Sequence, residues 1–282
     1  MTEAHDGSQT TDPASTERAS LLAAYDAQLR GVAEVQGSVS WDQSGPLWRA
    51  LSGRGGFVSY ESLESAGDVE AVDSLIGETV AFYAGHPDVE EFEWKTRGHD
   101  WPPELDRLLR AHGLEPDEVE TVMVGEAAHL AVDVELPEGV SVRRVDLLPD
   151  RDALVSEASE VAKSIFGDGP SGEEMLERLD RMQGREQFWV AEAVTDEGSR
   201  VVCSGRLALV EGTEFAGIWG GSTLPEWRGK GIYRALTAAR AHAALAEGVR
   251  YIQSDCTVMS RPILERSGLV AVTTSTPYVW RR

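Results

Sequence analysis

The sequence is poor in cysteine and in long apolar runs. Its 282 residues include only 2 cysteines, Cys203 and Cys256, which lack the spacing of a metal site, so we expect reduced core residues rather than disulfides. No apolar run reaches the roughly 18 residues that a membrane-spanning helix needs. The first residues lack the basic start and apolar core of a secretory signal. These absences predict a cytoplasmic protein without a membrane partner.

Basic residues are also scarce relative to acidic ones. The chain has 26 Lys and Arg against 48 Asp and Glu, which gives a net charge of −22. A nucleic-acid partner requires a basic face that neutralises phosphates, so the composition argues against one. A negative field would attract a cationic acceptor such as an amine, although acidic runs such as 88–93 also occur simply as solvated faces. We expect a monomer or a homodimer.

The most informative stretch is residues 219–236, WGGSTLPEWRGKGIYRAL. It predicts the end of a strand, a turn rich in glycine, and an amphipathic helix from Gly231 onward. A helix N-terminus presents unpaired N–H groups and a partial positive charge, so such a turn can hold an anion. Gly229 permits close backbone approach, and Arg228 and Lys230 add positive charge. The stretch therefore predicts a phosphate site, although many such turns only join elements.

The order of residues in this turn resembles the acetyl-CoA pyrophosphate loop of the GNAT acyltransferases, R/Q-x-x-G-x-G/A. Residues 228–233, RGKGIY, carry the resemblance, and PEW at 225–227 is similar to the Pro-acid-aromatic lead-in of that family. A Walker loop is excluded because no Gly-Lys-Ser/Thr follows, and the third glycine of a Rossmann fingerprint is missing. Tyr233 replaces the usual Gly or Ala, so we expect its side chain to point away from the phosphates.

Around the loop, the second part of the chain has the GNAT order of elements. Periodicity and turn residues predict strands at 141–145, 188–194, 201–210, 214–219, 251–256, 269–274 and 278–280, and helices at 150–165, 172–182, from 231 onward, and at 261–266. The resemblance covers about residues 139–282. It implies an α+β (α/β) fold, the GNAT fold, with a mixed, mostly antiparallel sheet flanked by helices.

The first part of the chain has a weaker pattern that parallels the second. It predicts helices at 19–29, 68–83 and 104–112, and strands at 55–60, 92–96 and 120–124. LRAHGL at 109–114 is similar to LERSGL at 264–269. The chain also resembles actinobacterial tandem-type GNAT proteins in which an E-W-K element, here 93–95, accompanies the R-G-x-G-I-Y loop.

We therefore expect three regions along the chain. Residues 1–18 are polar and lack apolar periodicity, which predicts a disordered tail. Residues 19–136 are expected to form a degenerate GNAT-like domain without a pyrophosphate loop. Residues 137–282 are expected to form the acyl-CoA-binding GNAT domain.

The resemblance implies an N-acyltransferase that moves an acetyl or other acyl group from acetyl-CoA to a small-molecule primary amine by direct attack. Acetyl-CoA (coenzyme A) would be the cosubstrate, and no metal is implied. Backbone contacts to pantetheine and an enclosure for the pyrophosphate are assigned by resemblance to Thr223, Leu224, Arg228, Gly229, Lys230, Gly231, Ile232 and Tyr233. Residues 220–221, a Gly-Gly pair, would let thioester and acceptor approach, or would form a β-bulge without a ligand.

The catalytic groups are less clearly marked. The tyrosine that often serves as acid in the family corresponds to Leu264, which cannot donate a proton, and the usual upstream asparagine corresponds to Thr257. Thr257 is therefore a candidate acid, with Cys256, Ser260 or water as the alternatives. Glu214, at the start of one predicted strand, and Asp255, at the end of the next, are candidate bases, with Asp255 nearer the cofactor. A further polar cluster, Glu93 with 99–100, would line the acceptor pocket if the halves face each other.

Two alternatives remain open at this stage. The departures at Leu264 and Tyr233 suit a catalytically dead CoA-binding module, which would bind without turnover. Tandem halves also suit a transferase that acts on a carrier such as aminoacyl-tRNA or on a protein amine, which would require a basic groove.

Overall fold

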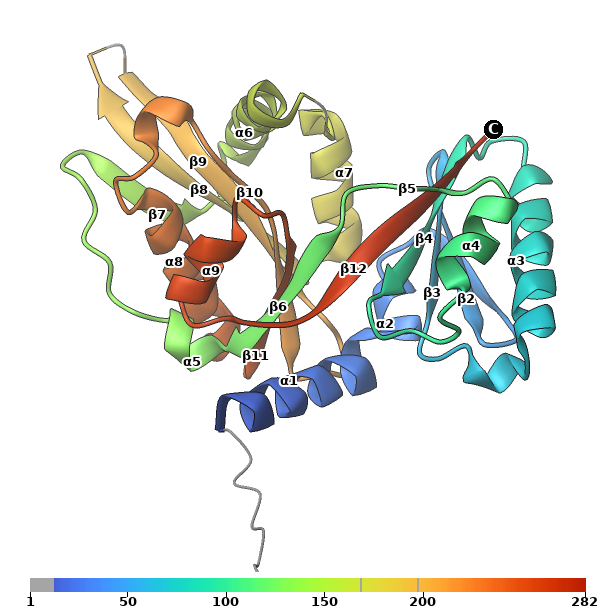
Figure 1. Ribbon diagram of the computed structural model, residues 1–282. Coiled ribbons are helices and arrows are strands. Elements are labelled where there is room, and N and C mark those ends of the chain that lie inside the picture. Colours follow the sequence, from blue (N-terminus) through green and yellow to red (C-terminus); the bar gives the residue numbers. More distant parts are fainter. Residues whose placement is uncertain (1–12, 168, 197) are drawn as a thin grey trace, which may run out of the picture.

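A single sheet runs through the molecule and carries helices on both faces. The computed structural model describes residues 13–167, 169–196 and 198–282 (Figure 1). Within these residues the strand order is β1-β2-β3-β4-β12-β6-β11-β10-β9-β8-β7, and β5 pairs with β12. Most neighbouring strands are antiparallel, so the predicted α+β fold with a mixed sheet flanked by helices is confirmed.

The strands are β1 Ser40–Ser44, β2 Leu47–Ser52, β3 Gly55–Tyr60, β4 Glu91–Arg97, β5 Glu115–Pro116, β6 Glu120–Glu126, β7 Val140–Arg144, β8 Glu186–Thr195, β9 Gly198–Leu209, β10 Phe215–Thr223, β11 Tyr251–Cys256 and β12 Val270–Arg281. The helices are α1 Pro13–Leu29, α2 Val32–Val35, α3 Val69–Ala84, α4 Leu105–Ala111, α5 Ala127–Leu130, α6 Arg151–Phe166, α7 Gly172–Met182, α8 Ile232–Ala246 and α9 Arg261–Arg266. Short 3-10 turns lie at Glu64–Ala66 and Pro225–Trp227.

The molecule consists of two similar halves, each with one parallel strand pair joined by a helix. In the first half, built on β1 to β4, the unit is β3–α3–β4, and in the second half, built on β7 to β11, it is β10–α8–β11. A parallel pair requires such a crossover connection, and its recurrence repeats the same supersecondary motif. The predicted tandem arrangement is thus present.

The halves exchange strands. The long strand β12 pairs with β6 through residues 270–275 and with β4 through residues 275–281, and Figure 1 shows it passing from the second half into the first. Strand β6 in turn lies between β12 and β11. The sequence predicted separate strands on either side of Pro277, but a proline removes only its own donor, and β12 continues through it. The regions expected at 19–136 and 137–282 therefore share one sheet.

Helix α1 corrects the predicted tail. The tail was expected to reach residue 18, but α1 begins at Pro13, and residues 1–12 lie outside the described part of the chain. The first turns of α1 are polar, so no apolar period marks them. Arg18 nevertheless donates from Nε and Nη2 to the Val272 carbonyl of β12, at 3.2 and 3.1 Å. Leu21 and Tyr25, further along α1, are buried against the sheet.

Different helices pack on the two faces of the sheet. Helices α5, α8 and α9 pack on one face of the second half, whereas α6 and α7 pack on the other. Helices α3 and α4 cover the outer face of the first half around the buried Trp94. The inner face of the first half, with α1 and α2, therefore meets the face that carries α7.

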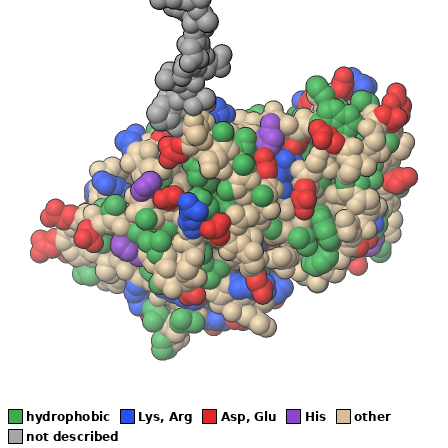
Figure 2. Space-filling view, turned by 90° about the horizontal axis from the view of Figure 1, so that it is seen from below, with side chains coloured by type: hydrophobic (Ala, Val, Ile, Leu, Met, Phe, Trp, Pro, Cys, Tyr) green, Lys and Arg blue, Asp and Glu red, His purple; other side chains and the backbone are tan. Residues whose placement is uncertain are grey.

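The surface charge, the cysteines and the apolar character of the helices can be compared with the expectations from composition. Seen from below, acidic and basic side chains are interspersed over the molecule (Figure 2). Cys203 and Cys256 are free and buried, as the sequence predicted. No helix in the described part of the chain has the length and apolar character needed to cross a membrane.

Candidate active site

A cavity of about 800 Å³ opens where β10 and β11 separate. The parallel register joins Phe215 to Tyr251 and ends at the pair Gly217 and Gln253, after which the strands diverge. The loop before α8 forms one wall of this cavity, α9 contributes another, and the end of α6 closes it with Ile165. We call this space the loop cavity.

The loop has the backbone geometry of an anion cradle. Gly229 and Gly231 have φ angles of 74° and 80°, in the left-handed region that glycine adopts readily. The first N–H groups of α8 have no acceptor within the helix, and they open toward the loop cavity. Arg228 donates from Nε to the Thr223 carbonyl at 3.1 Å, which anchors its guanidinium at the cavity wall. An anionic phosphate would complement this arrangement.

The structure brings most of the residues assigned to the cofactor to this cavity, together with one catalytic candidate. The described residues that line it include Thr223, Arg228, Gly229, Gly231, Ile232, Tyr233 and Thr257. Lys230 instead lies over the Trp227 ring, with Nζ 4.5 Å from the ring centroid. Leu224 is buried, and both of its backbone groups are bonded within the protein: its N–H to the Val202 carbonyl at 3.0 Å and its carbonyl to the Trp227 N–H at 2.9 Å.

Strand β10 carries a bulge at its glycine pair. The register between β10 and β9 shifts between Trp219 and Ser222, and Gly220 has a φ of 61°. A Cβ on Gly221 would lie 2.5 Å from the Tyr233 ring, so this ring packs on β10. Bulges leave a residue outside the ladder and redirect the strand. The bulge therefore gives a ligand access to the backbone of β10.

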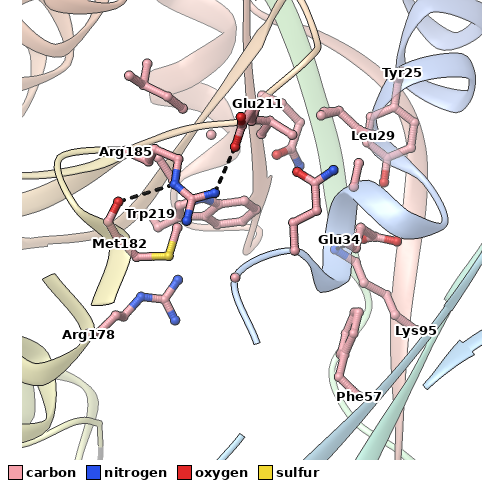
Figure 3. Close-up of a pocket in the computed structure, with 18 residues that line it drawn as sticks. Tyr25, Leu29, Glu34, Phe57, Lys95, Arg178, Met182, Arg185, Glu211 and Trp219 are labelled. Carbon is pink, nitrogen blue, oxygen red and sulfur yellow. Dashed lines mark hydrogen bonds and ion pairs between the residues drawn. The ribbon is translucent and has the colours of Figure 1, made fainter. Parts of the chain in front are cut away.

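A second pocket, of about 250 Å³, lies between the two halves on the other side of the bulge (Figure 3). Helices α1 and α2 and strands β3 and β4 of the first half contribute Tyr25, Glu34, Phe57 and Lys95 to it. The second half contributes α7 and Trp219. We call this space the inter-half pocket.

Strand β10 contributes residues to both spaces. A Cβ on Gly217 would lie 2.3 Å from the Trp219 indole nitrogen, so the indole lies directly over Gly217 in the inter-half pocket. Two residues further along β10, Gly221 lines the loop cavity. The linings of the loop cavity and of the inter-half pocket are therefore only two residues apart along β10, on either side of the bulge.

An ion-pair network crosses the seam beside this point. Asp255 lies on the same face of its strand as Gln253, at the level of Trp219 across the diverging strands. Lys95 Nζ from the first half donates to Asp255 Oδ2, and Gln253 Nε2 donates to Asp255 Oδ1 at 2.7 Å. Glu34 lies 3.5 Å from Lys95 Nζ. Asp255 therefore faces the seam between the halves, while Thr257 faces the loop cavity.

Burial and charge shift the protonation of the groups along this seam. Burial disfavours the charged form of Lys95, but Asp255 and Glu34 outweigh it and raise the pKa of its ammonium group. Burial raises the pKa of Glu93, on the same face of β4, to about 7, and the neighbouring carboxylates Glu34, Glu120 and Asp255 add to the shift. Burial therefore brings the pKa of Glu93 close to neutral pH, and burial also raises the pKa of the neighbouring Glu120.

Other candidates from the sequence lie elsewhere. Glu214 precedes β10 at the end opposite the phosphate loop, where it accepts from Gln28 at 3.1 Å. His99 contacts Asp26 at 3.1 Å. Asp100 joins β3, β4 and α1 through bonds of 2.7 Å each from Arg30 and Tyr60. None of these three side chains lines the loop cavity or the inter-half pocket within the described residues. Residues 99–100 lie in the turn after β4, whereas Glu93 lies within the strand, so the polar cluster expected from the sequence does not form one site.

The sequence did not predict Lys95 and Arg178 as site residues, although both line the inter-half pocket. Charged Glu93, Lys95 and Arg97 alternate with buried residues along β4, and this alternation was a signal that one face of the strand is polar. Arg178 on α7 carried no such signal, because an arginine on an amphipathic helix is usually solvated. Leu264 is fully buried in the core of the second half.

The first half lacks an open equivalent of the loop cavity's anion cradle. At the N-terminus of α3, the Asp68 carboxylate accepts from the Ala71 N–H at 2.9 Å. The protein's own anion thus occupies the position that a phosphate takes at a helix N-terminus.

Within the described residues, no group of three or more His, Cys, Asp or Glu side chains is arranged to hold a metal ion.

Comparison with known proteins identifies the fold. No family model and no curated protein matches the sequence. A tandem GNAT protein from the clavulanic acid biosynthesis pathway, without AcCoA, is 13% identical with a TM-score of 0.64, over 93% of this chain and 95% of that one. A GCN5-related N-acetyltransferase from Kribbella flavida is 15% identical with a TM-score of 0.58, over 88% and 93%. One from Sphaerobacter thermophilus is 18% identical with a TM-score of 0.56, over 84% and 76%. The chain therefore has the GNAT fold in its tandem form.

Proposed function

We propose that the chain is an acyl-CoA-dependent N-acyltransferase that moves an acetyl or other acyl group to a small primary amine. The observation that carries this proposal is the position of the loop cavity and the inter-half pocket on either side of the bulge of β10, with linings two residues apart along that strand. An anion cradle on one side and a small pocket with charged walls on the other suit a reaction between a phosphate-bearing donor and a separate acceptor.

The loop cavity fits coenzyme A. The N–H groups at the start of α8 and the Arg228 guanidinium would bind the pyrophosphate, and Thr223, at the end of β10, would lie along the pantetheine. A volume of about 800 Å³ is within the range of ligand pockets. Bound acyl-CoA supplies a thioester whose carbonyl carbon is the electrophile. The protein positions that carbon at the bulge, where a freed β10 N–H can polarise the carbonyl oxygen.

The acceptor amine would attack from the inter-half pocket. Its nitrogen forms a bond to the carbonyl carbon, the carbon–sulfur bond breaks, and the sulfur leaves as a thiolate. We assign the proton lost by the amine to Asp255, at the level of Trp219, through water, because Asp255 lies behind the pocket-lining residues Lys95 and Gln253. Thr257, which lines the loop cavity, or water returns a proton to the thiolate.

Calorimetric titration with acetyl-CoA tests the donor site. Arg228→Glu places a negative charge against the pyrophosphate and should weaken binding by at least about 2 kcal/mol, which is roughly thirtyfold. Lys230→Glu is the matched control, because it makes the same charge change two residues away at a side chain directed onto Trp227. It should weaken binding by less than about 1 kcal/mol, as expected for an exposed charge. Equal losses of acetyl-CoA affinity in both variants would mean that the overall charge of the loop, and not a specific contact of Arg228, determines binding.

A catalytically dead CoA-binding module is the second candidate. Its supporting observation is the burial of Leu264, where the family often has a tyrosine acid. Binding of acetyl-CoA without thiol release in the presence of any amine would favour the module. A folded protein that binds no acetyl-CoA would contradict both candidates.

A further inference from the structure

The charge of the inter-half pocket contrasts with that of the whole chain. The protein has a net charge of −22, yet three cations, Lys95, Arg178 and Arg185, line the pocket against two carboxylates, Glu34 and Glu211. Lys95 and Glu34 are already engaged in the network across the seam. The cations available to a ligand are therefore the two arginines on the α7 side.

Arg178 carries a positive charge that its partner compensates only in part. Its Nε donates to Glu186 Oε2 at 2.6 Å, while the other oxygen of Glu186 accepts from Arg206 Nη1 at 2.5 Å. The Glu186 side chain is fully buried and its one carboxylate is shared by two guanidinium groups, of which that of Arg178 remains 42% exposed on the pocket side. In Figure 3 the guanidinium of Arg178 extends from α7 into the pocket, with its terminal nitrogens toward the open space. This leaves donors for an anionic ligand.

Arg185 lies beside it on the same wall. Its Nε donates to the Met182 carbonyl at 3.3 Å, and Nη1 donates to Glu211 at 3.1 Å. The Glu211 side chain is 72% exposed, so this pair is in contact with solvent, and an incoming anion can compete for the guanidinium. Both arginines present the planar fork that matches a carboxylate.

From this geometry we infer that the acceptor is a small amino acid, whose carboxylate binds Arg178 and Arg185 while its amine faces Trp219 and the bulge. The inference rests on the proposed function. The two arginines line the pocket on the α7 side, whereas the Glu34 carboxylate lines it from α2 (Figure 3), so the two sides of the pocket suit opposite charges on one ligand. Phe57 and Met182 supply apolar contact between them, and a volume of about 250 Å³ limits the ligand to this size.

Paired probes test this inference. The wild-type protein is assayed with acetyl-CoA by thiol release, using leucine against isopentylamine, phenylalanine against phenethylamine, and phosphoethanolamine against ethanolamine. Each amino acid should exceed its decarboxylated partner in kcat/KM by at least about tenfold, since charge-assisted hydrogen bonds distinguish them. Comparable or better turnover of the decarboxylated amines would overturn the inference. A preference for phosphoethanolamine over every amino acid would show that the anionic group is a phosphate, and would overturn the assignment to a carboxylate.

Variants connect the preference to the arginines. Arg178→Gln should raise KM for the preferred amino acid by about tenfold and leave the decarboxylated amine unchanged, because only the former uses the charge. Arg143→Gln on β7 is the control, since that arginine is similarly exposed and also pairs through Nε with a glutamate, but lies outside the pocket. Unchanged acetyl-CoA affinity in Arg178→Gln confirms that the fold is intact. An equal loss for both members of a pair would contradict the inference.

Binding measurements separate the inference from the proposed function. The same probe pairs are titrated calorimetrically into the wild type and into Arg178→Gln. If no amine releases thiol but leucine or phenylalanine binds more tightly than its amine, and the variant loses that difference, the transferase proposal fails and the carboxylate site stands. If acyl transfer occurs with no preference for amino acids in turnover or in binding, the carboxylate site fails and the transferase proposal stands.

Discussion

The ion pair between Lys95 and Asp255 joins strand β4 of the first half to β11 of the second, and its disruption gives a measurable test of the fold. Only 12% of the Lys95 side chain and 3% of the Asp255 side chain are exposed. Replacing Lys95 with methionine keeps the volume and leaves the Asp255 carboxylate buried without its cation. Removing one partner of a buried pair typically costs about 3–5 kcal/mol. Gln253 still donates to Asp255, so we expect about 3 kcal/mol.

Urea unfolding followed by tryptophan fluorescence, near neutral pH, measures this loss. The raised pKa of Lys95 means that its contribution is complete below the ordinary lysine pKa of about 10.4 and falls only as pH rises above it, so a neutral buffer shows the full effect. The double variant Lys95→Met with Asp255→Asn removes both charges and should recover at least about 1 kcal/mol relative to additivity.

An exposed ion pair serves as the control. Arg54 and Glu90 are 75% and 55% exposed, so Arg54→Met should cost less than about 1 kcal/mol. The reasoning is refuted if Lys95→Met costs no more than this control, or if the double variant is as unstable as the sum of the single ones.

Two further predictions concern the same region. Burial holds the pKa of Glu93 at about 7 against an ordinary 4.5, so the folded protein retains a proton that the unfolded chain has lost, and the free energy of unfolding should fall by up to about 3 kcal/mol as pH rises through that window. Glu93→Gln should therefore be more stable than wild type by about 1–3 kcal/mol in urea unfolding near pH 8 and nearly equal near pH 4.5; a constant difference would contradict the shift. Gly217→Ala introduces a Cβ that would lie 2.3 Å from the Trp219 indole, so the ring must move. Acceptor turnover should fall at least about tenfold with acetyl-CoA affinity intact, whereas unchanged kinetics would remove Trp219 from the pocket's function.

The sequence predicted the locally determined elements well. The bounds predicted for β3, α7, β11 and α9 match the structure. Helix α7 shows why: Ser171 and Glu174 form a capping box at its start, and apolar residues recur along one face. Strand β1 was missed because none of its residues is buried, so it has no apolar alternation, and its partner β2 was missed with it.

The candidate site was predictable only where it is local in sequence. The loop 228–231, its glycines and the helix after them are contiguous, so one stretch of sequence specified this wall of the loop cavity. The inter-half pocket joins Lys95, Arg178 and Trp219 from separate strands and helices. The spacing of these residues along the sequence does not predict that they lie close together. Their proximity depends on how the two halves are joined through β6 and β12.

The exchange of β6 and β12 gives the first half a role in the molecule although it has no open anion cradle. Asp68 occupies the N-terminus of α3, so the first half holds its own carboxylate where the second half holds an open cradle. The first half still supplies Glu34, Phe57 and Lys95 as a wall of the inter-half pocket. Strand β12 pairs with both halves, so separating them would expose unpaired strand edges and break the pair between Lys95 and Asp255. The first half therefore has a structural and pocket-forming role that the second half cannot perform alone.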